Sequence, residues 1–203
     1  MDWKIIATLA IVMAIGVAIV SRTPEVSRFL EDMYSYVSPL PSNVTFALNA
    51  AYSGNVTLDA VNSSVEILPA SLSLEIAGGA LESRSRVTLS GFRGTVNVHE
   101  NSAEIDGTAD AIDAGGAIIR YSSGPVKGIA EFSALSVAGV AMRSLSVNVS
   151  SGTLDADGKN TSLNSGVIAI LSPSADYAFS GGTMYAKGIA RRIEVPSSGI
   201  IIG

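Results

Sequence analysis

Five asparagines stand in N-x-[Ser/Thr] triplets, the motif that accepts an N-linked glycan, and none of the triplets contains proline. All five lie beyond the apolar N-terminal segment: Asn43, Asn55, Asn62, Asn148 and Asn160. In a host that glycosylates, these sites place the C-terminal region outside the cytoplasm, because a glycosylated segment belongs to a secreted or surface-exposed region. The alternative is a Ser/Thr-rich strand surface that never meets a glycosyltransferase.

A second spacing loosely resembles a calcium loop. Asp155, Asp157, Gly158 and Asn160 form D-x-D-G-x-N, but the segment is short and lacks a distal bidentate acid. Residues 152–158 match residues 182–188 as a weak internal repeat, in which Lys187-Gly188 is equivalent to Asp157-Gly158. The comparison favours a tight turn, and we predict no metal site.

The remaining candidates for chemistry are three acids and one histidine. Asp106, Asp110 and Asp113 fall in an extended segment, where a solvated strand face is expected, since a glycosidase pair needs a cleft and a defined separation. His99 is the only histidine, and His99-Glu100-Asn101 is typical of the end of a hairpin. An enzyme with an acidic site is therefore the least favoured hypothesis.

Composition excludes several other classes of function. The chain has no cysteine, so thiolate catalysis, disulfides and Cys-ligated metals are ruled out. It also lacks G-x-S-x-G and a phosphate-binding loop. The net charge of the chain is -5, and its basic residues are scattered along the sequence. Both observations argue against nucleic acid as a partner. We predict a protein that is not an enzyme and holds no cofactor.

Residues 1–22 read as a transmembrane anchor. Residues 5–20 carry no charge and no proline, and together with Trp3 and Lys4 they are long enough to cross a bilayer. Contact with lipid is expected for residues 3–21, with Lys4 and Arg22 near the headgroups. A cleaved signal peptide is the alternative, although the first residues carry little net positive charge.

Residues 23–41 predict an amphipathic helix followed by a Pro-containing linker. Thr23-Pro24-Glu25 is a suitable helix start, and Pro39 and Pro41 mark the end. An apolar stripe at helical spacing runs along this segment: Val26, Phe29, Leu30, Met33 and Val37. The stripe is expected to pack on the following domain, or alternatively to lie on the membrane surface.

Residues 42–203 alternate apolar and polar side chains, which predicts antiparallel strands with one face packed and one face wet. We expect a mainly β fold, one antiparallel β-sandwich or jelly-roll-like domain, with a β-solenoid or β-roll as the alternative. Residues 199–203 are expected to form a final edge strand. Turns are predicted at Ser53-Gly54, Gly78-Gly79, Gly115-Gly116, Ser123-Gly124-Pro125, Ser151-Gly152, Asp157-Gly158 and Gly181-Gly182.

A short helix followed by a β domain with recurring Gly-x-φ-x-φ openings resembles the single-pass proteins of lipid-transport bridges, the LptC and AsmA-like groups. The segments that carry the likeness are residues 89–99 and 105–109, within a similarity of texture over residues 43–195. The resemblance implies an open β-groove that shields acyl chains between membranes. The resemblance assigns no functional residue.

The sequence therefore predicts a single-pass membrane protein of the cell envelope whose β domain lies outside the cytoplasm. The favoured function is a non-enzymatic structural or protein-interaction role, in which exposed strand edges bind an envelope protein or a second copy. The alternative is a carrier of lipid or another hydrophobic ligand, with an apolar groove between curved sheets.

Overall fold

The computed structural model describes residues 43–203, which form one compact unit. The anchor predicted for residues 1–22 and the amphipathic helix predicted for residues 23–41 lie outside the described residues. Within residues 43–203, no helix has both the length and the apolar character needed to span a bilayer. The described chain is mainly β, as the alternation predicts.

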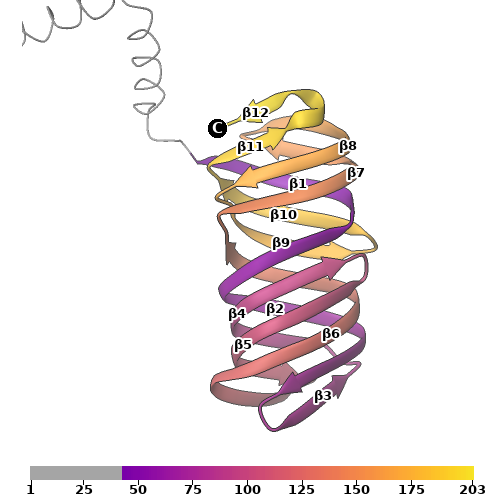
Figure 1. The fold of residues 1–203 in the computed structure, drawn as a ribbon, viewed down its shortest axis with the longest axis vertical. Helices are drawn as coiled ribbons and strands as arrows, with labels where there is room; N and C mark the ends of the chain where they lie inside the picture. The colour runs from indigo at the N-terminus through magenta and orange to yellow at the C-terminus, as the bar shows by residue number, and fades with distance from the viewer. Residues whose placement is uncertain (1–42) are drawn as a thin grey trace, which may run out of the picture. The chain divides into compact units, whose positions relative to one another are not determined.

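Twelve strands and one short 3₁₀ turn make up this unit (Figure 1). The strands are β1 (Val44–Ser53), β2 (Asn55–Ile76), β3 (Gly79–Ser83), β4 (Val87–His99), β5 (Ser102–Ala114), β6 (Ala117–Ala141), β7 (Ser144–Ala156), β8 (Lys159–Leu171), β9 (Ser174–Ser180), β10 (Thr183–Ala190), β11 (Arg192–Val195) and β12 (Ile200–Ile202), and the 3₁₀ turn is η1 (Pro196–Ser198).

The strands follow the predicted two-residue period. Val44, Phe46 and Leu48 of β1 are buried, and the residues between them are exposed. The same alternation holds along β2, β4 and β7. Successive side chains of a strand point to opposite faces, so each strand contributes one apolar row to the interior and one polar row to the surface.

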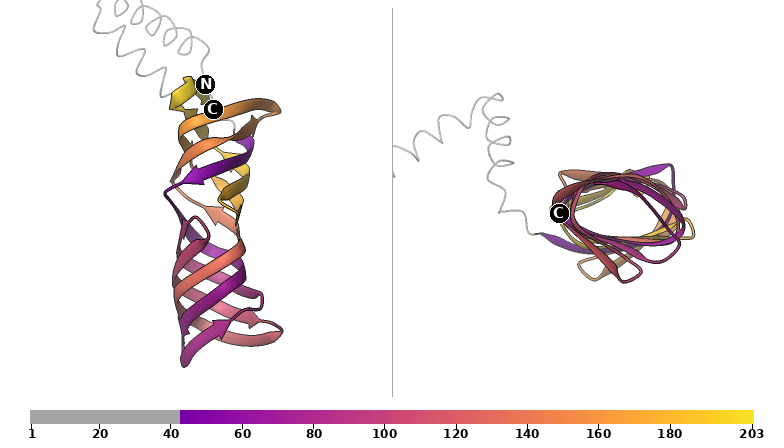
Figure 2. Two further views of the ribbon diagram at one scale, coloured as in Figure 1. Left: turned by 90° about the vertical axis from the view of Figure 1, so that its right-hand side faces the viewer. Right: turned by 90° about the horizontal axis from the view of Figure 1, so that it is seen from below.

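All twelve strands belong to a single antiparallel sheet, in the order β12-β11-β8-β7-β1-β10-β9-β6-β5-β4-β2-β3, with an additional pairing of β6 with β2. The sheet rolls up into a flattened tube, and its strands run obliquely to the long axis of the tube (Figures 1 and 2). A sandwich of two separate sheets was the predicted form. Here the two facing walls come from one rolled sheet, because β2 and β6 are long enough to pair with three strands each.

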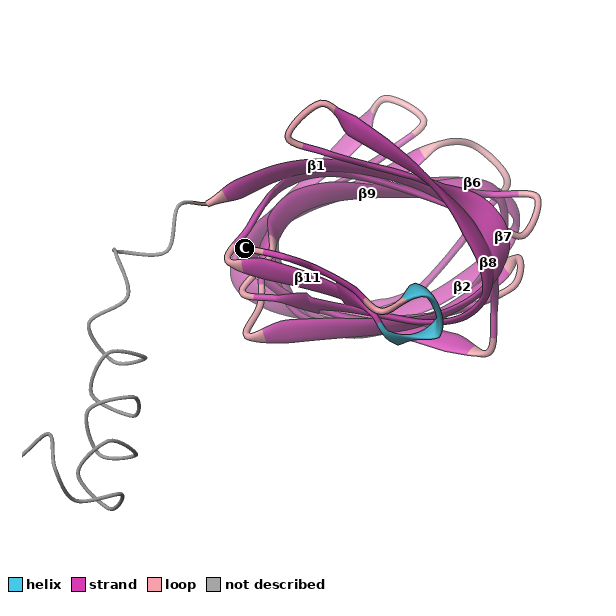
Figure 3. Ribbon diagram, turned by 90° about the horizontal axis from the view of Figure 1, so that it is seen from above, coloured by secondary structure: helices cyan, strands magenta, loops and turns pink. Residues whose placement is uncertain are grey.

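The sheet winds round the tube as a spiral. One row of paired residues runs from Ile76 of β2 through Val126, Gly107 and Gly94, and it returns to the same strand at Ala60. This closure involves β2, β4, β5 and β6. Viewed along the tube, the strands form an ellipse (Figure 3).

The interior of the ellipse is filled by side chains. Val56, Leu58, Val96, Ile105 and Ile168 are completely buried. The inward positions are mostly Val, Ile, Leu and Ala, which agrees with the low aromatic content, and a continuous apolar core joins both walls. Burial of this apolar surface is the main source of stability for a domain without disulfides.

Two predicted turns are wrong because the chain stays extended there. Ser151-Gly152 lies inside β7, where Gly152 is paired with Ala50, and a Cβ at residue 152 would overlap the backbone oxygen of Asn49. Ser123-Gly124-Pro125 lies inside β6, with Ser123 at φ 73° close to a register shift. Glycine in these strands permits close strand approach or an irregularity, and it does not reverse the chain.

The turns at Gly115-Gly116, Asp157-Gly158 and Gly181-Gly182 are confirmed, with positive φ at each of these residues. Glu100, with φ 50°, and Asn101 close the hairpin after His99, also as predicted. Residues 199–203 contain β12, which ends the sheet as an edge strand.

Candidate functional site

All five asparagines of the glycosylation motifs are exposed. Asn43 precedes β1, Asn55 and Asn62 lie on β2, Asn148 lies on β7 and Asn160 lies on β8. Among the described strands, β3 to β6 and β9 to β12 carry none of them. A glycan on any of the five would lie outside the packed interior and would not disturb it.

Local backbone geometry favours side-chain exposure at three of these sites. Asn62 has φ 59° at a register shift of β2, so its side chain leaves the regular alternation. Asn148 pairs with Ser53 and lies beside Gly54, and Asn55 begins the next strand directly after this glycine. The sites at residues 55 and 148 are therefore neighbours on the surface.

Asp155 and Asp157 serve the β7–β8 turn. Asp155 Oδ1 accepts a hydrogen bond from the backbone N–H of Gly158 at 3.0 Å. Asp157 Oδ1 accepts from both the backbone N–H and the hydroxyl of Thr45, each at 2.8 Å. The turn interpretation is confirmed, but one argument for it is wrong: Lys187-Gly188 lies within β10 and is no turn.

Asp106, Asp110 and Asp113 lie along β5 and are each used locally. Asp106 pairs with Lys127 at 3.1 Å, and Asp110 receives two hydrogen bonds from Arg93, at 3.0 and 3.3 Å. Asp113 accepts from the backbone N–H of Gly116. These contacts fit the predicted solvated strand face. In residues 43–203, no group of three or more His, Asp or Glu side chains is arranged to hold a metal ion.

Two charged groups on this face have shifted pKa values. The hydrogen bond to Asp106 raises the pKa of Lys127, and the hydrogen bond to Asp110 raises the pKa of Arg93. Both side chains are exposed, and exposed ion pairs of this kind add little to stability.

The first surface feature that the sequence analysis missed is an outer hollow of about 540 Å³, here called the Tyr185 hollow. It extends over β6, β9, β10, β1, β7 and β8, and its apolar part includes Ala47, Ala138, Ala178 and the half-exposed ring of Tyr185. Polar groups also line it: Asn49, Ser136, Thr153, Asp155, Asn160, Asp176 and Lys187. A volume of this size lies within the range of roughly 300–1,000 Å³ for small-ligand sites.

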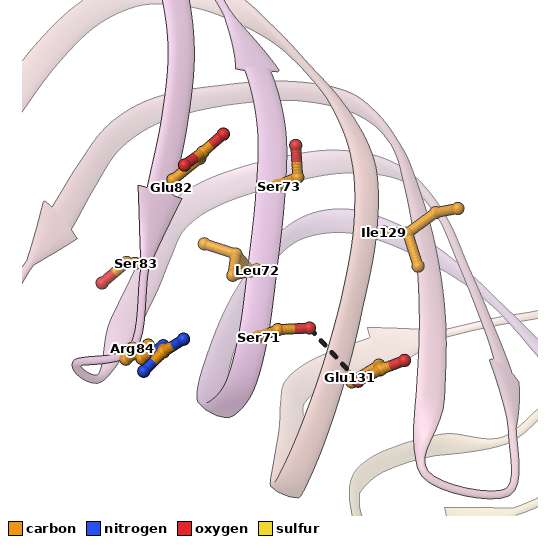
Figure 4. A pocket seen from close by; sticks show the side chains of 8 residues that line it. All are labelled: Ser71, Leu72, Ser73, Glu82, Ser83, Arg84, Ile129 and Glu131. Atoms are coloured by element: carbon orange, nitrogen blue, oxygen red, sulfur yellow. Dashed lines mark hydrogen bonds between the residues drawn. The ribbon is translucent and has the colours of Figure 1, made fainter.

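The second missed feature is a hollow of about 470 Å³ over β3, β2 and β6, here called the acid-rimmed hollow (Figure 4). Ile129, 59% exposed, lies at one side of it, and Ser71 donates a hydrogen bond to Glu131 at 3.2 Å. Glu82 and Arg84 line the side formed by the β3 segment. A second depression, lined by Glu75, Glu104 and Lys127, also adjoins Ile129.

Both hollows leave a signal in the sequence. Met184 and Ala186 are buried, so Tyr185 between them stands on the outward row of β10. Ala130 and Phe132 are buried, which places Ile129 outward on β6. A large apolar residue in the polar phase of a strand is the observation that identifies such a surface.

Two tyrosine side chains with shifted pKa values, Tyr52 and Tyr177, are buried in the domain. Tyr52 donates a hydrogen bond to the backbone oxygen of Glu100 at 2.7 Å, and burial, with a smaller effect of the Glu100 charge, raises its pKa to about 12. Burial also raises the pKa of Tyr177, whose hydroxyl has no hydrogen-bond partner among the described residues. Both side chains are buried, and Tyr177 is also one of the residues that line the Tyr185 hollow.

Searches against protein-family models, curated proteins and solved structures find no match for this chain.

Proposed function

We propose that this chain is a membrane-anchored glycoprotein of the cell envelope whose β domain lies outside the cytoplasm and binds a protein partner without catalysing a reaction. The observation that carries the proposal is the placement of the five glycosylation motifs. Every acceptor asparagine is exposed, and none of the five is among the residues that line the acid-rimmed hollow. A glycan-free region on an otherwise glycosylated domain is suited to contact with another protein.

The partner surface proposed here is the acid-rimmed hollow around Ile129. Its nearest neighbours across the sheet are Ser73 and Glu104, and Glu131 follows on the same outward row. Lys127 on this row is already paired with Asp106. Glu82 and Glu131 line the hollow together with one basic side chain, Arg84, so the surface combines an exposed apolar side chain with a small excess of negative charge. This fits a partner segment with an apolar residue flanked by Lys or Arg.

The topology can be tested with the four lysines of the chain. Lys127, Lys159 and Lys187 are exposed in the β domain, whereas Lys4 lies before the predicted anchor. A membrane-impermeant amine reagent applied to intact cells that express the full-length chain should label the three β-domain lysines and spare Lys4. Labelling of the three only after permeabilisation would contradict the proposal.

Site-resolved glycopeptide mass spectrometry on the same preparation measures the occupancy of the five asparagines. We expect glycans on several of them. If the lysines are labelled from outside but no asparagine carries a glycan, the β domain still lies outside the cytoplasm. The argument for a glycan-free partner surface would then be lost.

The lipid-carrier alternative ranks second. It requires an apolar inner face that is open to a ligand, whereas the inward side chains of residues 43–203 are buried against one another. Native mass spectrometry of the full-length chain separates the two hypotheses: a lipid that stays bound after removal of the detergent would favour the carrier.

A further inference from the structure

Asn160 differs from the other four glycosylation sites because it also lines the Tyr185 hollow. It lies at the start of β8, two residues after the Asp157-Gly158 turn. Thr45 fixes this turn through two hydrogen bonds to Asp157. The acceptor asparagine is thus held at the margin of the hollow by a defined hairpin.

The register of the sheet leads from this site towards Tyr185. Asn160 pairs with Asp155, which pairs with Ala47, and Ala47 pairs with Lys187 of β10. The adjacent row joins Ser162, the hydroxyl residue of the same motif, through Thr153 and Asn49 to Tyr185. Two neighbouring rows of outward residues therefore connect the glycosylation motif with the aromatic ring.

The lining suits a sugar. Ala47, Ala138 and Ala178 have short side chains and leave an apolar surface in the hollow, and Tyr185 offers a flat ring that is 48% exposed. Sugar rings present C–H groups that pack on an aromatic face, while their hydroxyls need hydrogen-bond partners. The amide of Asn49, the hydroxyl of Thr153 and the ammonium of Lys187 supply such partners at the same surface.

We propose that the glycan on Asn160 folds back into the Tyr185 hollow and packs its first sugar residues against Tyr185. This inference rests on the proposed function, because it requires the β domain to meet a glycosyltransferase. The packed glycan covers the outer wall formed by β1, β9 and β10, whereas glycans on the other four asparagines extend into solvent.

The test compares the rates at which an amidase that cleaves the sugar–asparagine bond removes each glycan from the folded, full-length chain. The chain is produced in a eukaryotic host that N-glycosylates membrane proteins, and cleavage is followed site by site by mass spectrometry. Since a packed glycan must first leave the hollow, we expect cleavage at Asn160 to be about tenfold slower than at Asn148. The difference should vanish once the chain is unfolded by heat.

Variants identify the cause of the protection. Tyr185→Ser should bring the rate at Asn160 up to that at Asn148, while Tyr185→Phe, which keeps the ring, should stay slow. Ile189→Ser is the matched control, because Ile189 is exposed on the same row of β10 but does not line the hollow. Circular dichroism and the melting temperature of each variant confirm that it remains folded, since both replaced side chains point outward.

Three outcomes overturn the inference. Equal cleavage rates at Asn160 and Asn148 in the unchanged protein would do so, and so would slow cleavage that persists in Tyr185→Ser. An empty Asn160 beside occupied sites elsewhere would also overturn it and leave the proposed function intact. Failure of the proposed function itself has a different signature, since the β-domain lysines would then be labelled only after permeabilisation.

Discussion

The hydroxyl of Tyr177 is the one buried side-chain oxygen or nitrogen without a hydrogen-bond partner among the described residues. It lies on β9, whose inward side chains Ala175, Tyr177 and Phe179 are all buried. A buried hydroxyl that loses its water without gaining a partner costs about 1–3 kcal/mol.

Removing this hydroxyl should stabilise the protein. We expect Tyr177→Phe to raise the free energy of unfolding by about 1 kcal/mol, because the ring remains and the unpaired group is gone. Tyr52→Phe is the control of opposite sign: its hydroxyl donates to Glu100, so its loss should cost about 1 kcal/mol. Urea unfolding of the full-length chain in detergent, followed by circular dichroism, measures both. A destabilised Tyr177→Phe would show that the hydroxyl has a partner.

Tyr52 also predicts how stability depends on pH. Burial raises its pKa to about 12 in the folded protein, above the value of about 10 for an unfolded tyrosine. The protonated phenol therefore contributes its full stability below pH 10, and the contribution is lost as the pH rises from about 10 to 12. We expect a fall on the order of 2 kcal/mol from this residue across that window.

The measurement is the free energy of unfolding as a function of pH, for the unchanged chain and for Tyr52→Phe. The variant should lose less stability between pH 10 and 12. Parallel curves would mean that Tyr52 ionises at an ordinary pKa in the folded state.

At the scale of elements, glycines within strands set how closely neighbouring strands approach. Gly188 of β10 faces Ser174 and Ala175 of β9, and a Cβ at residue 188 would overlap the backbone oxygen of Ser174. We expect Gly188→Ala to destabilise the protein by about 2 kcal/mol, since the paired strands must separate to make room. Thermal unfolding checks this value, with Lys187→Ala, an exposed neighbour, as the control. Equal melting temperatures for the two variants would contradict the assigned contact.

The two-residue period was sufficient to predict several strands and their inward faces, because alternation reports directly which face is buried. Val87 and Leu89 of β4, and Leu145 and Val147 of β7, are inward as expected. Two glycines were wrongly assigned to turns, since Gly152 and Gly124 lie inside strands. The sequence alone does not distinguish a glycine in a strand from a glycine in a turn, because it does not show which residue lies across from the glycine on the neighbouring strand.

The hollows could not be located from the sequence for a related reason. Tyr185 is recognisable as outward, but the three alanines beside it come from β1, β6 and β9, which only the strand order brings together. The exposure of the glycosylation sites can be predicted without knowing the strand order. Asn148 lies in the polar phase of an alternating strand and Asn160 lies just past a turn, and both of these are local features.

At the scale of the whole molecule, the acid-rimmed hollow is lined by residues of β2, β6 and the β3 segment and includes none of the five acceptor asparagines. If the acid-rimmed hollow binds the partner, a charge at its apolar centre should abolish the complex. We expect Ile129→Lys to reduce the amount of partner cross-linked to the full-length chain in intact cells at least about tenfold, as is typical for loss of a central contact.

Ile118→Lys is the matched control for this prediction. Ile118 is 57% exposed, close to the value of Ile129, and lies on the same strand but outside the acid-rimmed hollow. Equal loss in both variants would indicate a general effect of added charge. If both variants retain the cross-linked partner, the partner binds elsewhere on the domain.

The strand order also determines when each part of the domain can form during synthesis. Strands β2 to β6 close their spiral among themselves, whereas β1 pairs only with β7 and β10. At about 5–20 residues per second, the ribosome needs on the order of ten seconds to pass from β1 to β10. Neither edge of β1 has a partner until β7 is made, and the edge that pairs with β10 stays open until that strand follows. The first strand of the domain is thus among the last to be protected from aggregation.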